Sequence, residues 1–184
     1  MWSDLIFTKP TVHEARELGS FCTKCIDISY GTRTCSDEVS DQILTVTESQ
    51  VTSGLVEMLV HPDTKDLIGF FALKDPAVPL ADTVKDTGAH TDTVTVSAHT
   101  NTTDTLSIEL GNLFVHPDYH HQGIGTRLFQ QAISKAKSLN RHRMTWVSDP
   151  GAEAFYRKIG ASATGHDHNI LNPAVPVPLF EIQI

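Results

Sequence analysis

The sequence predicts an α/β fold in which helices cover a mixed, mostly antiparallel sheet of about seven strands. Two observations support this fold class. Residues 55–60 and 67–73 are apolar runs joined by the turn-forming His61-Pro62-Asp63, a pattern typical of an antiparallel hairpin. After residue 105, strand-like and helix-like patterns alternate, as they do where helices pack on a sheet. The chain has 184 residues, so we expect a single domain over 1–184.

Composition and charge restrict the class of protein. The 22 acidic and 14 basic residues give a net charge of −8, which disfavours nucleic acid or an anionic membrane as a partner. No apolar run approaches the roughly 18 residues of a membrane span, and the first residues lack the basic start of a secretory signal. We therefore expect a cytoplasmic protein, a monomer or a homodimer, without a nucleic-acid or membrane partner.

The N-terminal part predicts a short strand followed by a capped helix. Residues 5–7 are the apolar run of the strand. Thr11 and Glu14 have the spacing of a capping box, and apolar residues then recur at helical spacing to about Ile28. A further helical stretch is expected over about 37–48, before the hairpin begins.

Cys22 and Cys25 have the spacing of a redox pair or of half a zinc site. Both cysteines also lie on the apolar stripe of the first helix, where a cysteine behaves as a small hydrophobe. Packing in the core is therefore the favoured interpretation, and redox or zinc chemistry is the alternative. The total of 3 cysteines is odd, which does not fit a disulfide framework.

Residues 75–104 interrupt the alternation of strands and helices. This segment is rich in proline, aspartate and threonine and has one short alternating piece at 94–98. We interpret it as a Thr-rich insertion, such as an extended hairpin or a flap, rather than as a domain.

The strand predicted over 105–115 changes its apolar face partway along. Its apolar residues are first even-numbered and then odd-numbered: Leu106, Ile108 and Leu110, followed by Leu113 and Val115. Because strand side chains alternate, keeping one face buried requires an extra residue, most simply a bulge at Gly111-Asn112. Such a bulge splays the strand from its neighbour and frees backbone groups for a ligand. A bulge that only bends the sheet is the alternative.

The remaining pattern predicts the last helices and strands. They are a helix from Ile124 to about Ala136, a strand at 144–147, a short helix at 151–159, and strands at 161–165 and 179–184.

Residues 116–125 place three histidines and two glycines between a strand and a helix. The histidines could bind a metal, but neighbours on an extended chain point to opposite sides, and no thiolate or carboxylate pattern completes the set. We therefore expect no metal. Gly123 and Gly125 open a helix directly after the strand, where free backbone N–H groups at the positive helix end can bind phosphate. A tight strand-to-helix turn is the alternative.

Two motifs in this region resemble a known family. Residues 109–125, ELGNLFVHPDYHHQGIG, closely resemble the acetyl-CoA signature of the GNAT superfamily of N-acetyltransferases, Q/R-x-x-G-x-G/A after a V-x-P strand end. Residues 149–161, DPGAEAFYRKIGA, resemble its second signature, N-x-x-A-x-x-F-Y-x-x-x-G-F. The chain departs from these patterns at His120, Asp149 and Ala161, where Arg or Gln, Asn and Phe are usual.

The resemblance implies a GNAT-like sheet, in which a splayed pair of strands holds acetyl-CoA as the co-substrate. Backbone groups of residues 113–115 would pair with the pantetheine arm, and the glycine turn would hold the pyrophosphate. The cofactor-binding residues implied in this way are Leu113, Phe114, Val115, His120, His121, Gln122, Gly123, Ile124, Gly125, Thr126, Asp149 and Tyr156. Because phosphate is held mainly by backbone donors, the departures need not abolish binding.

Acyl transfer to an amine requires a base for the amine and a proton for the departing thiolate. Tyr156, which matches the motif tyrosine, is the expected acid, since a phenol stays protonated at neutral pH; core packing is its alternative role. Glu109 is the expected base, directly or through water, and an ordinary polar strand residue is the alternative. His116 and His142 are lesser candidates for the base, and Arg127 could reach phosphate or be solvated.

We therefore expect an acetyl-CoA-dependent N-acetyltransferase that acts by direct transfer on a primary amine of an unidentified small molecule or peptide. The net acidity mildly favours a cationic acceptor. The main alternative is a non-catalytic module that binds or senses acyl-CoA. A zinc or redox protein that uses Cys22 and Cys25 is a third class.

Overall fold

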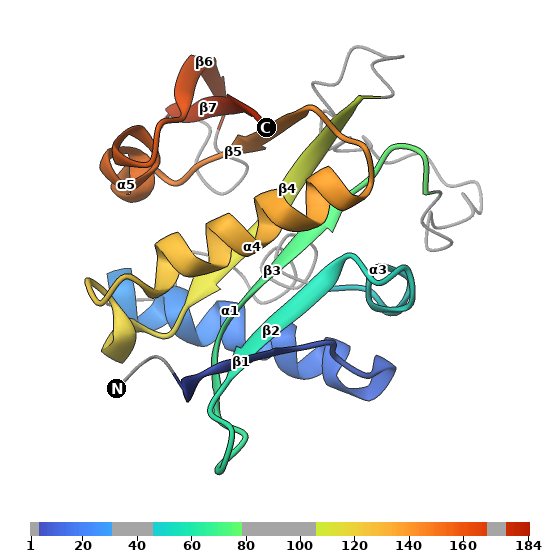
Figure 1. The fold of residues 1–184 in the computed structure, drawn as a ribbon. Coiled ribbons are helices and arrows are strands. Elements are labelled where there is room, and N and C mark those ends of the chain that lie inside the picture. The colour runs from blue at the N-terminus through green and yellow to red at the C-terminus, as the bar shows by residue number, and fades with distance from the viewer. Residues whose placement is uncertain (1–3, 31–45, 79–105, 169–175) are drawn as a thin grey trace, which may run out of the picture.

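A computed structural model of the chain describes residues 4–30, 46–78, 106–168 and 176–184, which form a seven-stranded sheet with the strand order β1-β2-β3-β4-β5-β7-β6 (Figure 1). The strands are β1 (Ile6–Thr8), β2 (Val56–Val60), β3 (Leu67–Lys74), β4 (Ser107–Val115), β5 (Arg143–Val147), β6 (Ser162–His168) and β7 (Pro176–Gln183). Neighbouring strands are antiparallel, except that β4 and β5 run parallel. The predicted mixed sheet is confirmed.

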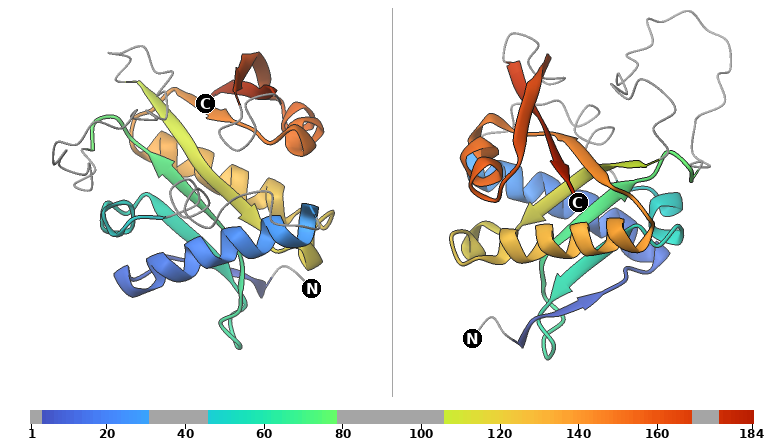
Figure 2. Two further views of the ribbon diagram at one scale, coloured as in Figure 1. Left: turned by 180° about the vertical axis from the view of Figure 1, so that it is seen from behind. Right: turned by 45° about the horizontal axis from the view of Figure 1, so that its top comes forward.

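Helices cover both faces of this sheet. They are α1 (Ala15–Tyr30), α3 (Glu48–Thr52), α4 (Ile124–Ser138) and α5 (Glu153–Lys158), with 3-10 turns at Val12–Glu14, Pro117–Tyr119 and Pro150–Ala152. The two long helices α1 and α4 lie on opposite faces, as the view from behind shows (Figure 2). None of the helices in the described ranges is both long and apolar enough to span a membrane.

Because both faces are covered, the sheet separates two hydrophobic cores. The core on the α4 face includes Phe71 and Leu73 of β3 with Leu128 and Phe129 of α4. The core on the α1 face includes Phe70 and Ala72 of β3 with Leu18 and Cys22 of α1. Successive residues of β3 therefore bury their side chains on alternate faces, which explains why residues 67–73 are a continuous apolar run instead of an alternating one.

The predictions for the N-terminal part have mixed outcomes. The capping box is confirmed, since the Glu14 carboxylate accepts from the Thr11 N–H at 2.6 Å. The cysteines of α1 are buried, as the packing interpretation requires. Most of the predicted helix at 37–48 lies outside the described residues, and α3 begins only at Glu48, its expected last residue. The insertion at 75–104 also lies outside them after residue 78.

The predicted bulge is present in β4. Ala72 of β3 pairs with Asn112, whereas Leu73 pairs with Leu110, so Gly111 is the extra residue. A Cβ atom at Gly111 would lie 2.8 Å from the Cε atom of Lys74, so a side chain at this position would push Lys74 aside. The bulge returns Leu113 and Val115 to the α4-side core, as their odd numbering predicted.

The expectation for Leu106 is wrong. This residue precedes β4 and its side chain is 50% exposed, instead of sharing the buried face of Ile108 and Leu110. The parity rule holds only inside the paired strand, because the alternation of faces depends on extended backbone held by its neighbours.

A buried ion pair joins the end of β3 to the connection between α4 and β5. Arg141 donates from Nη2 to Asp75 Oδ1 at 2.7 Å and from Nε to Oδ2 at 3.2 Å. Asp75 also accepts from the Ala77 N–H at 2.9 Å. The Asp75 side chain is only 3% exposed, so the carboxylate depends on these partners to offset its lost hydration.

Replacing one member of this buried pair should destabilise the fold strongly. Asp75→Asn removes the negative charge that the buried Arg141 guanidinium contacts at 2.7 Å, and we expect the free energy of unfolding to fall by about 3 kcal/mol. The matched control is Arg157→Gln, which removes the exposed pair with Glu153 and should cost less than about 1 kcal/mol. Urea denaturation of the three proteins measures both values, and equal losses would show that the Asp75 pair contributes no more than a surface contact.

Candidate functional site

Strands β4 and β5 pair over only three residues and then part. The pairs are Ser107 with Arg143, Ile108 with Met144, and Glu109 with Thr145. β4 continues to Val115 along β3, whereas β5 leaves it and leads toward α5 (Figure 1). The predicted splay is confirmed, and it begins just before the bulge at Gly111.

Within the described residues, the splay leaves one edge of β4 without a neighbouring strand beyond Glu109. The His116 N–H donates to the Ile68 carbonyl of the β3 side at 2.8 Å. Because backbone groups in an antiparallel strand alternate between its two edges, those of Val115 and Leu113 face the splay and those of Phe114 face β3. The contact of His120 Nε2 with the Val115 carbonyl, at 3.0 Å, confirms this direction, since His120 lies outside the sheet.

The three predicted residues of β4 therefore differ in what they offer. Leu113 and Val115 direct N–H and C=O groups into the splay. Phe114 instead packs its ring on Phe70, with the ring centroids 6.0 Å apart, and belongs to the α1-side core.

The turn before α4 has the conformation that its glycines predicted. His121 and Gly123 have positive φ angles of 58° and 81°, and α4 begins at the next residue, Ile124. In the described part of the chain, no carbonyl accepts a hydrogen bond of good geometry from the six backbone N–H groups of residues 121–126. Their partial positive charge adds to that of the helix end, so the turn is suited to an anion.

The two glycines of the turn serve different purposes. A Cβ atom at Gly123 would meet nothing within 4 Å, so this position is open and its glycine is required by the φ angle of 81°. A Cβ atom at Gly125 would lie 3.4 Å from ring carbons of Phe155. Gly125 thus allows the start of α4 to lie close against α5, which carries Tyr156.

Asp149 positions the start of the α5 segment. Its carboxylate accepts from the Gly151 N–H at 2.6 Å and caps the 3-10 turn that leads into α5. Asparagine could cap this turn in the same way, so the departure from the motif keeps the local structure.

Tyr156 lies in the α4-side core, in a cluster of aromatic rings. Its ring centroid is 4.9 Å from that of Trp146, 5.0 Å from Phe155 and 5.6 Å from Phe180. Burial raises the pKa of Tyr156 well above its ordinary value, and the nearby Asp149 charge raises it further. The phenol is therefore protonated throughout the physiological pH range.

Glu109 points to the other face of the sheet. Its neighbours Ile108 and Leu110 enter the α4-side core, so alternation directs Glu109 away from it. On that face the Glu109 carboxylate accepts from Lys74 Nζ at 2.8 Å. Glu109 and Tyr156 thus lie on opposite faces, both close to the level at which β4 and β5 part.

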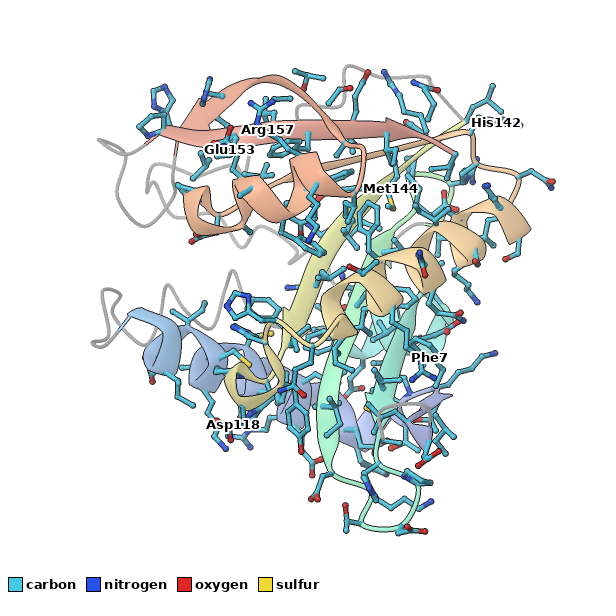
Figure 3. All side chains as sticks on the ribbon, turned by 60° about the vertical axis from the view of Figure 1, so that its left-hand side comes forward. Phe7, Asp118, His142, Met144, Glu153 and Arg157 are labelled. Carbon is cyan, nitrogen blue, oxygen red and sulfur yellow. The ribbon has the colours of Figure 1, made fainter. Side chains whose placement is uncertain are left out.

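The lesser candidates have other contacts. Arg127 donates from Nη2 to the Leu5 carbonyl at 2.6 Å, and its guanidinium carbon is 5.4 Å from the Phe7 ring centroid, so it holds β1. The His116 Nδ1 atom accepts from the Asp118 N–H at 3.3 Å. His142 is exposed at the start of β5, far from the turn that contains Asp118 (Figure 3).

Sequence reasoning missed two residues near the splay, Lys74 and Trp146. Lys74 meets Glu109 across 35 positions of sequence, so no local pattern could indicate the contact. Trp146 looked like an ordinary apolar strand residue. Among the described residues, no group of three or more His, Cys, Asp or Glu side chains could hold a metal ion.

Comparisons with known proteins show the family and the shared fold. The sequence model of the Acetyltransferase (GNAT) family matches residues 54–161. The PaiA N-acetyltransferase of Thermoplasma acidophilum, solved with coenzyme A, has a TM-score of 0.65 at 15% identity, covering 98% of this chain and 99% of its own. An acetyltransferase of the GNAT family from Staphylococcus aureus has a TM-score of 0.66 at 14% identity, covering 97% and 98%.

A third solved structure, YncA of Salmonella typhimurium with acetyl-CoA, has a TM-score of 0.62 at 14% identity, covering 97% of this chain and 93% of its own. At such low identities these structures show that the fold is shared. No curated protein sequence matches the chain.

The raised pKa of Tyr156 predicts a specific titration behaviour. The chain has 3 tyrosines, and between about pH 9 and 11 the folded wild type and Tyr156→Phe should show the same rise in absorbance at 295 nm. In denaturant the wild type should ionise one more tyrosine than the variant. The sign follows from linkage: the folded state holds the proton more tightly, so stability is lost as pH rises above the ordinary tyrosine pKa. If the folded wild type ionises one more tyrosine than the folded variant in this pH range, Tyr156 is not buried as described.

Proposed function

Because the chain belongs to the GNAT acetyltransferase family, we propose that it transfers an acetyl group directly from acetyl-CoA to a primary amine of a small molecule or peptide. The observation that carries this proposal is the convergence of two sets of unpaired backbone groups at the splay. One set lies on the edge of β4 beyond β5 and comprises the N–H and C=O groups of Leu113 and the N–H group of Val115, whose carbonyl is held by His120. The other set is the turn over residues 121–126.

The residues present fit acetyl-CoA. The pantetheine arm has amide groups that can pair with the N–H and C=O groups of Leu113 and with the Val115 N–H, as an added strand pairs with a sheet edge. The pyrophosphate suits the six N–H groups of the turn, where Gly123 leaves the backbone open to approach. The coenzyme A and acetyl-CoA in two of the structural neighbours support this assignment.

The expected cofactor-binding residues are therefore proposed with direct roles for most of them and indirect roles for Phe114 and Asp149. Residues 121–126 offer backbone donors, and His120 ties the turn to the end of β4 through the Val115 carbonyl. Asp149 contributes indirectly, because it caps the turn that leads into α5 and so positions Tyr156. Phe114 contributes through its ring in the α1-side core, and its backbone faces β3.

Acetyl-CoA supplies a thioester whose carbonyl carbon an amine can attack. The amine must first lose a proton to become nucleophilic, and Glu109 can accept that proton, directly or through water. Lys74 holds the Glu109 carboxylate from the β3 side at 2.8 Å, which fixes the position of the carboxylate without removing its second oxygen from use.

Tyr156 is proposed to donate its hydroxyl proton toward the sulfur as the thiolate leaves. Burial keeps the phenol neutral, so the donor needs no counter-charge. The same burial makes Tyr156 a weaker acid than a thiol, so its effect is a hydrogen bond that stabilises the developing thiolate; the sulfur leaves as the thiolate and takes its proton from solvent.

A non-catalytic module that binds acyl-CoA is the second candidate. The observation that favours this candidate is the ion pair between Glu109, the proposed base, and Lys74, which neutralises the Glu109 charge. The two candidates differ in one measurement, because only the enzyme releases coenzyme A when an amine is added. A thiol assay over a broad panel of amines therefore separates them.

Binding of acetyl-CoA should depend on the glycine turn. Gly123→Glu places a side chain and a negative charge where the phosphates are expected, and calorimetry should show at least a tenfold loss of affinity, about 1.4 kcal/mol. The control is Gly54→Glu, because Gly54 has a similar positive φ of 71° and equally open surroundings. Equal losses in both variants would place the cofactor elsewhere, and no binding by the wild type would refute the proposed function.

The two proposed catalytic groups should differ in their pH profiles. Tyr156→Phe should lower kcat by about 100-fold with the shape of the profile unchanged, since the phenol does not titrate in this range. Glu109→Gln should lower kcat/KM for the amine near neutral pH and recover as pH rises and more amine is unprotonated. Lys74→Met is the control, since it breaks the same ion pair but keeps the carboxylate. Equal effects of Glu109→Gln and Lys74→Met would assign Glu109 a structural role.

A further inference from the structure

Trp146 lies where β5 leaves β4. Its neighbour Thr145 forms the last pair between the two strands, with Glu109, so Trp146 is the first residue of β5 beyond the paired part. The Trp146 side chain is 3% exposed and packs in the α4-side core. Figure 3 shows Met144, two residues earlier on the same side of β5, among the side chains between β5 and α4.

The indole N–H of Trp146 is buried without a hydrogen-bond partner in the described structure. A buried donor that loses water and gains no acceptor costs about 1–3 kcal/mol. Buried tryptophans usually place this group against an acceptor, so an orphaned one calls for an explanation. A ligand that supplies a hydrogen-bond acceptor would offset the free-energy cost of burying this indole N–H.

Three aromatic rings pack around the Trp146 ring. Phe129 of α4, Tyr156 of α5 and Phe180 of β7 enclose it, with ring centroids 5.4, 4.9 and 5.8 Å from that of Trp146. The Trp146 ring is therefore covered by α4, α5 and β7. The remaining neighbour of β5 in the sheet is β4, which has moved away at this level.

The chemistry of the donor selects the ligand atom. An indole N–H only donates, so it requires an acceptor and cannot serve an ammonium group. A phosphate would have to carry its charge into the aromatic cluster, whereas a neutral carbonyl oxygen enters at lower cost. Trp146 also contacts Tyr156, the proposed acid beside the sulfur, which places the indole close to the acyl end of the cofactor.

We propose that Trp146 is a further cofactor-binding residue, whose indole N–H donates to a carbonyl oxygen of the acyl-pantetheine arm. This inference rests on the proposed function, since it presupposes acetyl-CoA in the splay. Two carbonyls share the required chemistry: that of the thioester and that of the nearer pantetheine amide. In the first case the indole polarises the reacting carbonyl, and in the second it positions the arm.

The test observes the indole N–H directly by NMR. The chain has 2 tryptophans, so Trp2→Phe leaves a single indole ¹H–¹⁵N signal, that of Trp146. This protein is titrated with acetyl-CoA and with ethyl-CoA, a thioether that lacks the thioester carbonyl, while calorimetry confirms that each ligand binds. We expect the indole proton to move downfield and to exchange more slowly with solvent when the ligand binds.

The two ligands distinguish the two carbonyls. A response to acetyl-CoA alone assigns the thioester carbonyl, and a response to both ligands assigns the pantetheine amide. Calorimetric binding with no change in the Trp146 signal overturns this proposal and leaves the proposed function intact. Absence of calorimetric binding refutes the proposed function itself, so the two failures are distinguishable.

A variant tests the same contact without NMR. Trp146→Phe keeps an aromatic ring in the cluster and removes the donor, and we expect about a tenfold weaker affinity for acetyl-CoA. Trp2→Phe is the control and should bind as the wild type does. Near-ultraviolet circular dichroism establishes that Trp146→Phe is folded, and unchanged affinity in the folded variant contradicts the proposal. If the variant does not fold, the NMR titration of Trp2→Phe decides.

Discussion

The parting of β4 from β5 after three paired residues is the constraint on which the site depends. Every backbone N–H and C=O group needs a partner, and inside a sheet the neighbouring strand supplies it. β3 serves one edge of β4 as far as Val115, but the other edge loses its strand beyond Glu109. The bulge at Gly111 lies within this stretch and bends the strand while both cores stay filled. The pairing with β3 thus keeps β4 in the sheet, while the edge that β5 leaves beyond Glu109 can pair with an extended ligand.

The groups around the splay include several unused donors. The turn over residues 121–126 presents N–H groups, Tyr156 keeps its proton, and Trp146 has an indole N–H without an acceptor. Such a lining suits a ligand rich in phosphate and carbonyl oxygens. It is also compatible with the net charge of −8, because backbone dipoles can supply the positive potential that the proposed phosphate site requires. Arg127, the basic residue of the first turn of α4, is bound to Leu5 and Phe7.

Sequence periodicity predicted most elements because each depends on local alternation. The strands, the two long helices and the bulge at Gly111 followed from which residues are apolar and at what spacing. The error at Leu106 has a physical reason, since alternation carries no information beyond the end of a paired strand. The helix α3 was also missed, and its five residues are too short for a helical period to be recognised. Motif resemblance, and not periodicity, indicated the cofactor.

The sequence by itself determined the succession of strands and helices along the chain, the glycine turn before α4 and the candidates Tyr156 and Glu109. These depend on local backbone preferences and on motifs of neighbouring residues. Only the tertiary structure decided which faces those candidates occupy, that Lys74 holds Glu109, and that Asp75 is paired with Arg141. It alone placed Trp146 beside Tyr156 with a buried donor. Such contacts join residues far apart in the chain, and their geometry is set by strand register and helix packing, which no short stretch of sequence contains.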